Sequence, residues 1–310
     1  MQLHDRIYVA GHTGLVGRAI VRKLNEGGYD NLVLKTSSEL DLRDQTTVQK
    51  FFQTEKPDYV FLAAAKVGGI LANATFPADF IYDNIIIAGN IINSSYKFGV
   101  KKLMNLGSSC IYPKYTTQPI NEEALLTGLL EPTNEAYAIA KIAAIKMCSA
   151  YNKQYKTNFL SVMPTNLYGP YDDFSLDNSH VLPALIRRFH TAKINHAPIV
   201  KLWGDGSPKR EFLYVDDLAS CVIFLMQQKS AVDLGDFVNI GTGTDISITE
   251  LGQLVRNIVG YKGAIKWDSS KPNGTPRKLL DSQKIHSLGW THTIELSNGI
   301  QKTYDWFKSR

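Results

Sequence analysis

The chain has 310 residues, of which 44% are apolar and 20% are charged, and its formal net charge is +5. This length and apolar content suit one large or two closely packed domains, and the scattered Lys and Arg residues, which form no polybasic run, argue against nucleic acid as a partner. The polar stretch 1–6 has no signal-peptide pattern, no apolar run reaches membrane-spanning length, and the three cysteines have no paired or metal-like spacing, so we expect a cytoplasmic protein without a membrane partner or a metal site.

The first half of the sequence alternates short apolar segments with segments of helical periodicity. Short apolar strands between helices are typical of a parallel sheet that is covered on both faces. We therefore predict an α/β fold with a Rossmann-type doubly wound parallel sheet. The expected strands are 7–10, 31–34, 59–63, 101–107 and 159–162, and the expected helices are 15–24, 46–53, 77–98 and 135–155.

The pattern of the sequence changes after Pro164, where the expected loops become longer and richer in Gly, Pro, Asn and Asp. Such loops suit a second lobe that closes over the carboxyl end of the sheet. We expect a dinucleotide-binding domain at 1–165 with returning segments near 212–240. A smaller α/β substrate-binding lobe is expected to make up most of 166–310.

Three glycines follow the first strand and open the first helix. Gly11 permits a tight turn, Gly14 lets a pyrophosphate approach the backbone at the helix N-terminus, and Gly17 permits close packing of the helix on the sheet. Their spacing resembles the short-chain dehydrogenase/reductase pattern. In this strand–turn–helix context the motif predicts a dinucleotide site that also includes Thr13, Leu15 and Val16.

The end of the second strand indicates which dinucleotide binds. Proteins that bind NAD usually place an acid there, about twenty residues beyond the glycines, to bond the ribose hydroxyls. Segment 34–38 reads Leu-Lys-Thr-Ser-Ser and has no acid. An acid would repel a 2′-phosphate, whereas Lys35 and hydroxyls such as that of Ser37 can bind one, so we expect NADP(H). A solvated surface charge is the alternative interpretation of Lys35.

Tyr137 and Lys141 are four residues apart, so they share one face of a helix. A nearby ammonium stabilises the phenolate and makes Tyr137 a better proton donor to an alkoxide that forms at neutral pH. Ser108, at the end of the fourth strand, can donate a hydrogen bond to the same oxygen. The three residues predict reduction of a ketone by the bound nucleotide, with an accidental helix pair as the alternative.

Cys110 and His180 are candidates for a second reaction at the same ketone. A carbonyl acidifies the C–H bonds beside it, and inverting such a carbon needs a base on one face and an acid on the other. Thiol and imidazole groups titrate at about 8.5 and about 6.5, which suits them to these roles. The alternatives are a buried core cysteine and a histidine at the entry of a helix, because sequence spacing does not place the two residues across from each other.

Six longer segments are more specific than these single residues. They are 63–70, 107–113, 131–137, 163–170, 210–217 and 274–281. Together they resemble the GDP-L-fucose synthases, which are dual epimerase/reductases among the extended short-chain dehydrogenases that act on nucleotide sugars. The similarity runs over nearly the whole chain.

The resemblance implies roles for individual residues. Tyr137 is the proton donor of a reductase triad with Ser108 and Lys141, while Cys110 is the epimerisation base and His180 the acid. Besides the glycine motif, Lys35 and Ser37, the implied cofactor-binding residues are Asp41, Leu42, Ala63, Ala65, Leu106, Tyr137, Lys141, Pro164, Asn166, Leu167 and His180. The implied substrate-binding residues are Ser108, Ser109, Cys110, Asn166, Arg188, Trp203, Arg210 and Asn273.

The resemblance also implies a reaction and an assembly. The reaction is NADPH-dependent C3/C5 epimerisation of GDP-4-keto-6-deoxymannose, followed by C4 reduction to GDP-L-fucose. The assembly is a homodimer through the helices at 77–98 and 135–155.

Two departures keep alternatives open. Thr13 and Ser37 stand where a member of the family has arginine, and Asn273 stands where it has aspartate. One alternative is a C4-reductase, with or without epimerisation, of another GDP-4-keto-sugar such as a heptose in surface-polysaccharide synthesis. The other is a non-enzymatic NADP-binding regulator, against which the intact set of Ser108, Tyr137 and Lys141 argues.

Overall fold

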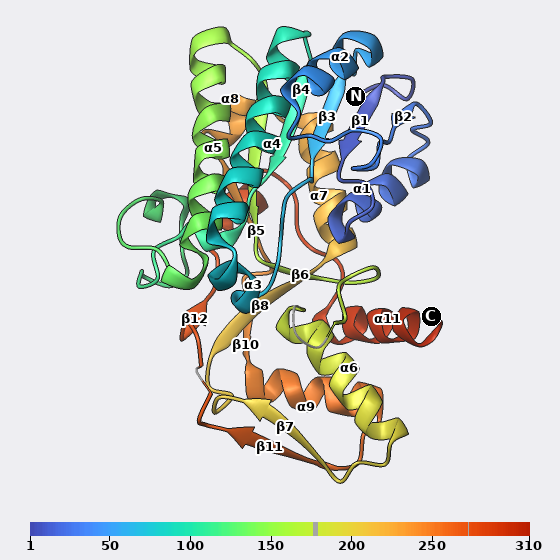
Figure 1. Cartoon of the computed structure of the whole chain (residues 1–310), viewed down its shortest axis with the longest axis vertical. Coiled ribbons are helices and arrows are strands. Elements are labelled where there is room, and N and C mark those ends of the chain that lie inside the picture. Colours follow the sequence, from blue (N-terminus) through green and yellow to red (C-terminus); the bar gives the residue numbers. More distant parts are fainter. Residues whose placement is uncertain (176–178, 272) are drawn as a thin grey trace.

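The computed structural model (Figure 1) describes residues 1–175, 179–271 and 273–310, and its larger lobe is built on a six-stranded sheet. The strand order is β2-β1-β3-β4-β5-β9, and every neighbouring pair is parallel. This arrangement confirms the predicted α/β class. The strands are β1 (Ile7–Ala10), β2 (Leu32–Val33), β3 (Tyr59–Leu62), β4 (Lys102–Leu106), β5 (Phe159–Pro164) and β9 (Val238–Ile240).

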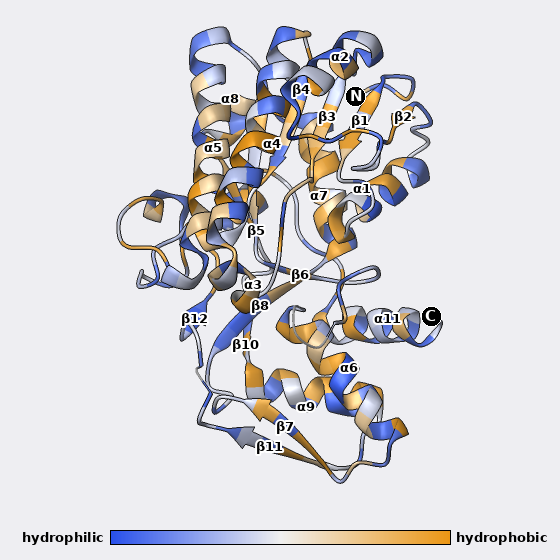
Figure 2. Cartoon of the chain, viewed as in Figure 1, coloured by the Kyte–Doolittle hydropathy of each residue, from blue (hydrophilic) through white to orange (hydrophobic). Residues whose placement is uncertain are grey.

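Helices cover both faces of this sheet. On β1, Ile7 and Val9 belong to one core cluster while Tyr8 and Ala10 belong to another, because successive side chains of a strand point to opposite faces. This double burial explains why β1 is apolar throughout, as Figure 2 shows. One face is covered by α1 (Leu15–Glu26) and α7 (Val215–Gln228), and the other by α2 (Gln45–Glu55), α4 (Pro77–Lys97) and α5 (Glu135–Tyr155).

The second lobe is smaller and is built around β8 (Lys209–Tyr214). This strand pairs with β10 (Asp245–Ser247), β12 (Arg277–Lys278) and β6 (Asn166–Tyr168). A separate pair joins β7 (Ile199–Trp203) to β11 (Ala264–Asp268). The helices α6 (Val181–Ile194), α9 (Ile248–Val259) and α11 (Leu296–Lys308) pack around these strands.

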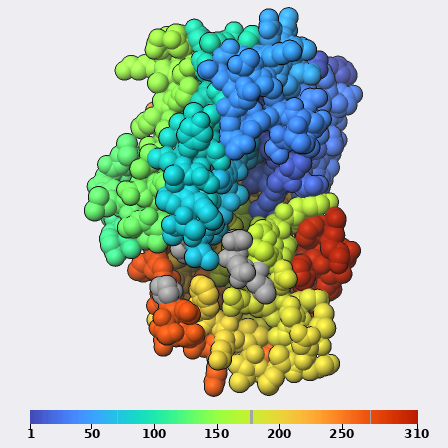
Figure 3. Space-filling model, in the orientation of Figure 1, coloured from blue at the N-terminus to red at the C-terminus, as the bar shows by residue number. Residues whose placement is uncertain are grey.

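The two lobes are stacked along the long axis of the molecule, as the space-filling view in Figure 3 shows. The chain crosses between them several times, since α7 and β9 return to the larger lobe after β8. Short elements complete the chain: α3 (Ile70–Thr75), α8 (Ala231–Leu234), α10 (Gln283–Ser287) and the 3₁₀ turns η1 (Ser109–Ile111), η2 (Glu122–Ala124) and η3 (Pro132–Asn134). No helix in the described ranges is long and apolar enough to cross a membrane.

Candidate active site

The glycine motif forms a tight turn between β1 and α1. Gly11 has a φ of +83°, and a Cβ atom at Gly17 would lie only 2.1 Å from the Gly11 carbonyl oxygen. Gly14 precedes α1, no side chain caps the helix there, and a Cβ at Gly14 would have its nearest contact at 3.6 Å. The first-turn N–H groups of α1 therefore face an open cradle that fits a diphosphate. Thr13 is exposed at the same turn.

The predicted adenosine end lies beyond β2. Lys35 is partly exposed and, within the described ranges, makes no ion pair. Asp41 is engaged differently, because the Arg43 guanidinium donates to both of its carboxylate oxygens at 3.0 and 2.8 Å and lowers the pKa of Asp41 to about 2. The Leu42 carbonyl accepts a hydrogen bond from Asn90 at 2.9 Å. Lys35 and the exposed Ser37 are thus available to a 2′-phosphate.

The predicted nicotinamide residues follow three strands that are neighbours in the sheet. Ala63 comes directly after β3, Leu106 ends β4, and Pro164 ends β5. Because these strands are parallel, their carboxyl ends share one edge of the sheet. Asn166 lies just beyond this edge, where its amide donates to the Glu211 carbonyl oxygen at 2.8 Å. Ala65 and Leu167 are partly buried in the same connections.

Ser108, Tyr137 and Lys141 come together at this edge. Ser108 lies between β4 and η1, while Tyr137 lies in the first turn of α5 and Lys141 in the second. The Lys141 ammonium donates to the Leu106 carbonyl at 2.9 Å and lies 5.6 Å from the ring centroid of Tyr137. A hydrogen bond joins Ser108 to the Tyr137 phenol.

The electrostatics of this set differ from the expectation in one respect. Burial raises the pKa of Tyr137, helped by Cys110 and opposed by the hydrogen bond with Ser108. The predicted lowering by Lys141 is not what the structure has, because desolvation of the phenol is the dominant effect. Burial also lowers the pKa of Lys141 to about 8, an effect that the Cys110 charge opposes. The phenol is therefore protonated at neutral pH, as a proton donor must be.

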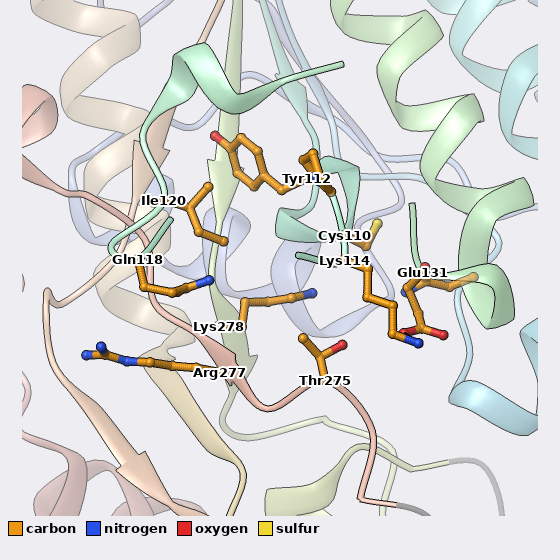
Figure 4. A pocket seen from close by; sticks show the side chains of 11 residues that line it. Cys110, Tyr112, Lys114, Gln118, Ile120, Glu131, Thr275, Arg277 and Lys278 are labelled. Atoms are coloured by element: carbon orange, nitrogen blue, oxygen red, sulfur yellow. The ribbon is translucent and has the colours of Figure 1, made fainter. Parts of the chain in front are cut away.

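Cys110 lies in η1, two residues after Ser108, and is only 8% exposed. It lines a cavity of about 40 Å³ whose wall is mainly polar (Figure 4). Burial raises the pKa of the Cys110 thiol, and Lys278, Ser108 and Lys141 act in the opposite direction. The other side chains of the wall are Tyr112, Pro113, Lys114, Gln118, Ile120, Glu131, Asn134, Thr275, Arg277 and Lys278.

Lys278 and Glu131 were not among the residues predicted from the sequence to form the site. Both lie within segments that carry the resemblance, but neither belongs to a short motif with its own chemistry. Lys278 comes next to Arg210 through the pairing of β12 with β8. This register between residues 68 positions apart has no local signal that could have revealed it.

His180 immediately precedes α6 and is exposed. The surrounding protein nonetheless lowers the pKa of its imidazole through desolvation, and Asp173 acts in the opposite direction. In the described part of the chain His180 is not among the residues that line the Cys110 cavity. Its placement opposite Cys110 across a bound sugar stays a prediction.

The predicted substrate residues come from both lobes. Arg188 on α6 donates to the Lys201 carbonyl at 3.2 Å, and Trp203 at the end of β7 is 61% exposed. Arg210 on β8 is partly buried, and burial lowers the pKa of its guanidinium. The Asn273 side chain accepts a hydrogen bond from the Asp205 N–H at 2.9 Å. Ser109 is buried in η1.

Comparison with known proteins gives the family. Residues 7–241 match the model of the NAD dependent epimerase/dehydratase family, so the chain belongs to this family. It is 60% identical over 302 residues to GDP-L-fucose synthase 1 of Arabidopsis thaliana, covering 97% of this chain and 93% of that protein. It is 54% identical over 309 residues to the GDP-L-fucose synthase of Escherichia coli strain K12, covering 98% and 96%.

A solved structure is also similar. The GDP-mannoheptose C4 reductase of Campylobacter jejuni, with NADP bound, superposes with a TM-score of 0.93 at 44% identity and covers 99% of each chain.

Proposed function

We propose that this member of the epimerase/dehydratase family is an NADPH-dependent epimerase/reductase that makes GDP-L-fucose from a GDP-4-keto-6-deoxy-sugar. Relatives of that name match the chain over nearly its full length. The observation that carries the proposal is the meeting of Ser108, Tyr137 and Lys141 with Cys110 at the edge of the sheet that the glycine turn also reaches. A plain reductase has no chemical use for a cysteine there.

The cofactor is held by residues of the larger lobe. The N–H groups at the start of α1 bind the diphosphate, and Lys35 with Ser37 binds the 2′-phosphate. Lys141, fixed by the Leu106 carbonyl, bonds the ribose next to the nicotinamide. When bound, NADPH supplies the hydride for the C4 carbonyl carbon. Tyr137 gives its proton to the C4 oxygen as the alkoxide forms, while Ser108 holds that oxygen.

Epimerisation precedes reduction at the same carbonyl. The Cys110 thiolate removes a proton from the carbon next to the ketone, and the electron pair moves onto the C4 oxygen. Ser108 and Tyr137 stabilise the enolate that results. His180 then returns a proton to the opposite face of the carbon, which inverts it. Proton exchange with solvent restores the thiolate and the imidazolium before the second carbon reacts.

The second lobe recognises the nucleotide. Arg188 and Arg210 carry charges that suit the diphosphate, because guanidinium groups bind phosphate oxygens in pairs. The exposed ring of Trp203 offers a stacking surface, and Asn273 at the neighbouring loop offers a polar contact.

Solvent deuterium tests this proposal. The protein is incubated with NADPH and GDP-4-keto-6-deoxymannose in heavy water, and deuterium is counted at C3 and C5 of the product. Two labels in GDP-L-fucose are expected. A reduced product with no label would contradict the epimerase half, and absence of NADPH consumption would contradict the whole proposal.

One alternative has a specific observation in its favour. The Campylobacter jejuni structure with a TM-score of 0.93 is a GDP-mannoheptose C4 reductase. Reduction of a GDP-4-keto-heptose at a higher kcat/KM than the 6-deoxy sugar would favour it.

We propose further that two copies pair through α4 and α5. These helices lie side by side at one face of the larger lobe (Figure 1) and expose large apolar side chains. Tyr82 is 63% exposed, Ile139 41% and Tyr155 42%. Light scattering is expected to give twice the 34.6 kDa chain mass, and Ile139→Asp is expected to lower that value.

We also propose that the protein works in the reducing cytoplasm. Cys110, Cys148 and Cys221 are all buried free thiols, which suits such a compartment. Fractionation of the source cells with an antibody against the protein would test this.

A further inference from the structure

Lys278 directs its ammonium into the cavity that Cys110 lines (Figure 4). The lysine belongs to β12 of the second lobe, whereas the cysteine belongs to η1 of the larger lobe. In the described part of the chain no carboxylate forms an ion pair with Lys278. A partly buried ammonium without an acid partner is costly, so its position calls for an explanation.

Two groups that can carry a negative charge act on Lys278, and Cys110 acts more strongly than Glu131. Arg210, its neighbour in register on β8, repels the ammonium. Glu131 attracts it weakly, and this carboxylate already pairs with Lys114 at 3.0 Å. The strongest favourable influence on the Lys278 charge comes from Cys110.

Lys278 in turn favours the charged form of Cys110. Lys278 on β12, Lys141 on α5 and Ser108 before η1 act on the Cys110 thiol, and the thiol acts on Tyr137 of α5. The other charged side chains that line the cavity are Lys114, Glu131 and Arg277. Burial favours the neutral thiol, and Lys278 opposes this more than Lys141 or Ser108 does. Lys141 is also committed to the Leu106 carbonyl at 2.9 Å.

The backbone holds Lys278 in this position. After Lys278, the Leu279 N–H donates to the Gln118 side chain at 2.9 Å, and the Leu280 N–H donates to the buried Glu211 carboxylate at 3.1 Å. The Ile120 N–H donates to the Leu279 carbonyl at 2.8 Å. Three hydrogen bonds therefore fix the backbone that follows Lys278.

We propose that Lys278 is a positioning residue that stabilises the thiolate of Cys110, so that this cysteine can act as a base. The inference rests on the proposed epimerase function, because only proton abstraction needs the thiolate. The thiolate is the basic and nucleophilic form of cysteine. Lys278 neither removes nor delivers a proton in the proposed epimerisation. It acts only by stabilising the negative charge on the Cys110 sulfur.

The test titrates the thiol in the free protein, without substrate. The ultraviolet absorbance of the thiolate is followed against pH, and the matching curve of a Cys110→Ser variant is subtracted in each background. Lys278→Met is expected to lower the thiolate-to-thiol ratio at neutral pH by about tenfold or more, since a nearby opposite charge shifts a pKa by about one to three units. Lys278→Arg is expected to keep the ratio within about threefold.

Two controls complete the test. Lys209→Met removes the same charge from an exposed position on β8, where Lys209 pairs with Arg277, the residue before Lys278. It is expected to leave the titration curve of Cys110 unchanged. NADPH binding by each variant reports whether the larger lobe is folded, and Lys278→Gln replaces Lys278→Met if the latter fails this check.

The results separate the two proposals. Superposed titrations for Lys278→Met and the parent overturn the role of Lys278 whatever the enzyme does with sugars. A shifted titration in a protein that labels neither C3 nor C5 upholds the electrostatic pairing and overturns epimerisation. In an active enzyme, Lys278→Met is expected to slow deuterium exchange at C3 and C5, and Lys278→Arg to restore it.

Discussion

Gly17→Ala tests how closely α1 packs on the turn that precedes it. The added methyl carbon would lie 2.1 Å from the Gly11 carbonyl oxygen and 2.7 Å from the His12 Cα. The first distance is more than 1 Å short of ordinary contact at 3.4 Å. Both neighbours are backbone atoms, so no rotamer change relieves the overlap. Overpacking of this kind costs about 1–3 kcal/mol, while alanine gains at most about 1 kcal/mol over glycine in a helix.

We take the upper end of that cost, because backbone has to move, and expect a net loss of about 2 kcal/mol in the free energy of unfolding. NADPH affinity is expected to fall at least about tenfold, because the same turn supplies the diphosphate cradle. Urea denaturation followed by tryptophan fluorescence gives the first quantity, and NADPH fluorescence titration gives the second. The matched control is Gly252→Ala in α9, where the added carbon would lie at an ordinary 3.6 Å from Leu202. Equal stability changes in the two variants, with NADPH affinity retained, would refute the packing argument.

Three further outcomes are expected. Tyr137→Phe removes the proton donor and should lower the rate of NADPH oxidation about 10²- to 10⁴-fold; turnover near the parent rate would remove its assigned role. Cys110→Ser should slow deuterium exchange at C3 and C5 but spare reduction of a ketone that is already epimerised, and equal loss of both would contradict the division of labour. Because burial lowers the pKa of Lys141 to about 8, kcat/KM for reduction should decline as pH rises through about 8. Stability should change in the opposite direction. An unfolded lysine keeps its proton up to about pH 10.4, so between about pH 8 and about pH 10.4 the unfolded state binds more protons than the folded state. The free energy of unfolding should therefore rise across this range by up to about 3 kcal/mol relative to Lys141→Met. A flat difference between the two proteins across that range would contradict the shift.

Local patterns predicted the larger lobe well. The strand at 7–10 and the helix at 135–155 coincide with β1 and α5, because each is a periodic run between clear boundaries. The strand predicted at 31–34 is shorter, since only Leu32 and Val33 pair with β1 at the edge of the sheet. The six-residue helix α3 was missed because it is too short for a periodic signal.

The second lobe could not be predicted in the same way. Its central strand β8 takes partners from three distant parts of the chain, and no local pattern fixes such pairings. The same limit applies to the site. The motifs identified Ser108, Tyr137 and Cys110. The raised pKa of Tyr137 depends on burial, and the position of Lys278 at the Cys110 cavity depends on the register of β12 with β8; both exist only in the folded molecule.

Because β12 belongs to the second lobe, the proposed epimerisation depends on how the two lobes are placed relative to each other. The glycine turn that fits the diphosphate of the dinucleotide lies within the larger lobe, whereas the proposed counter-charge of Cys110 lies on β12 of the second lobe. If the lobes moved apart, the glycine turn would stay intact, but Lys278 would no longer lower the pKa of the Cys110 thiol. On this proposal, the hydrogens at C3 and C5 of the sugar exchange fastest while the two lobes are in contact.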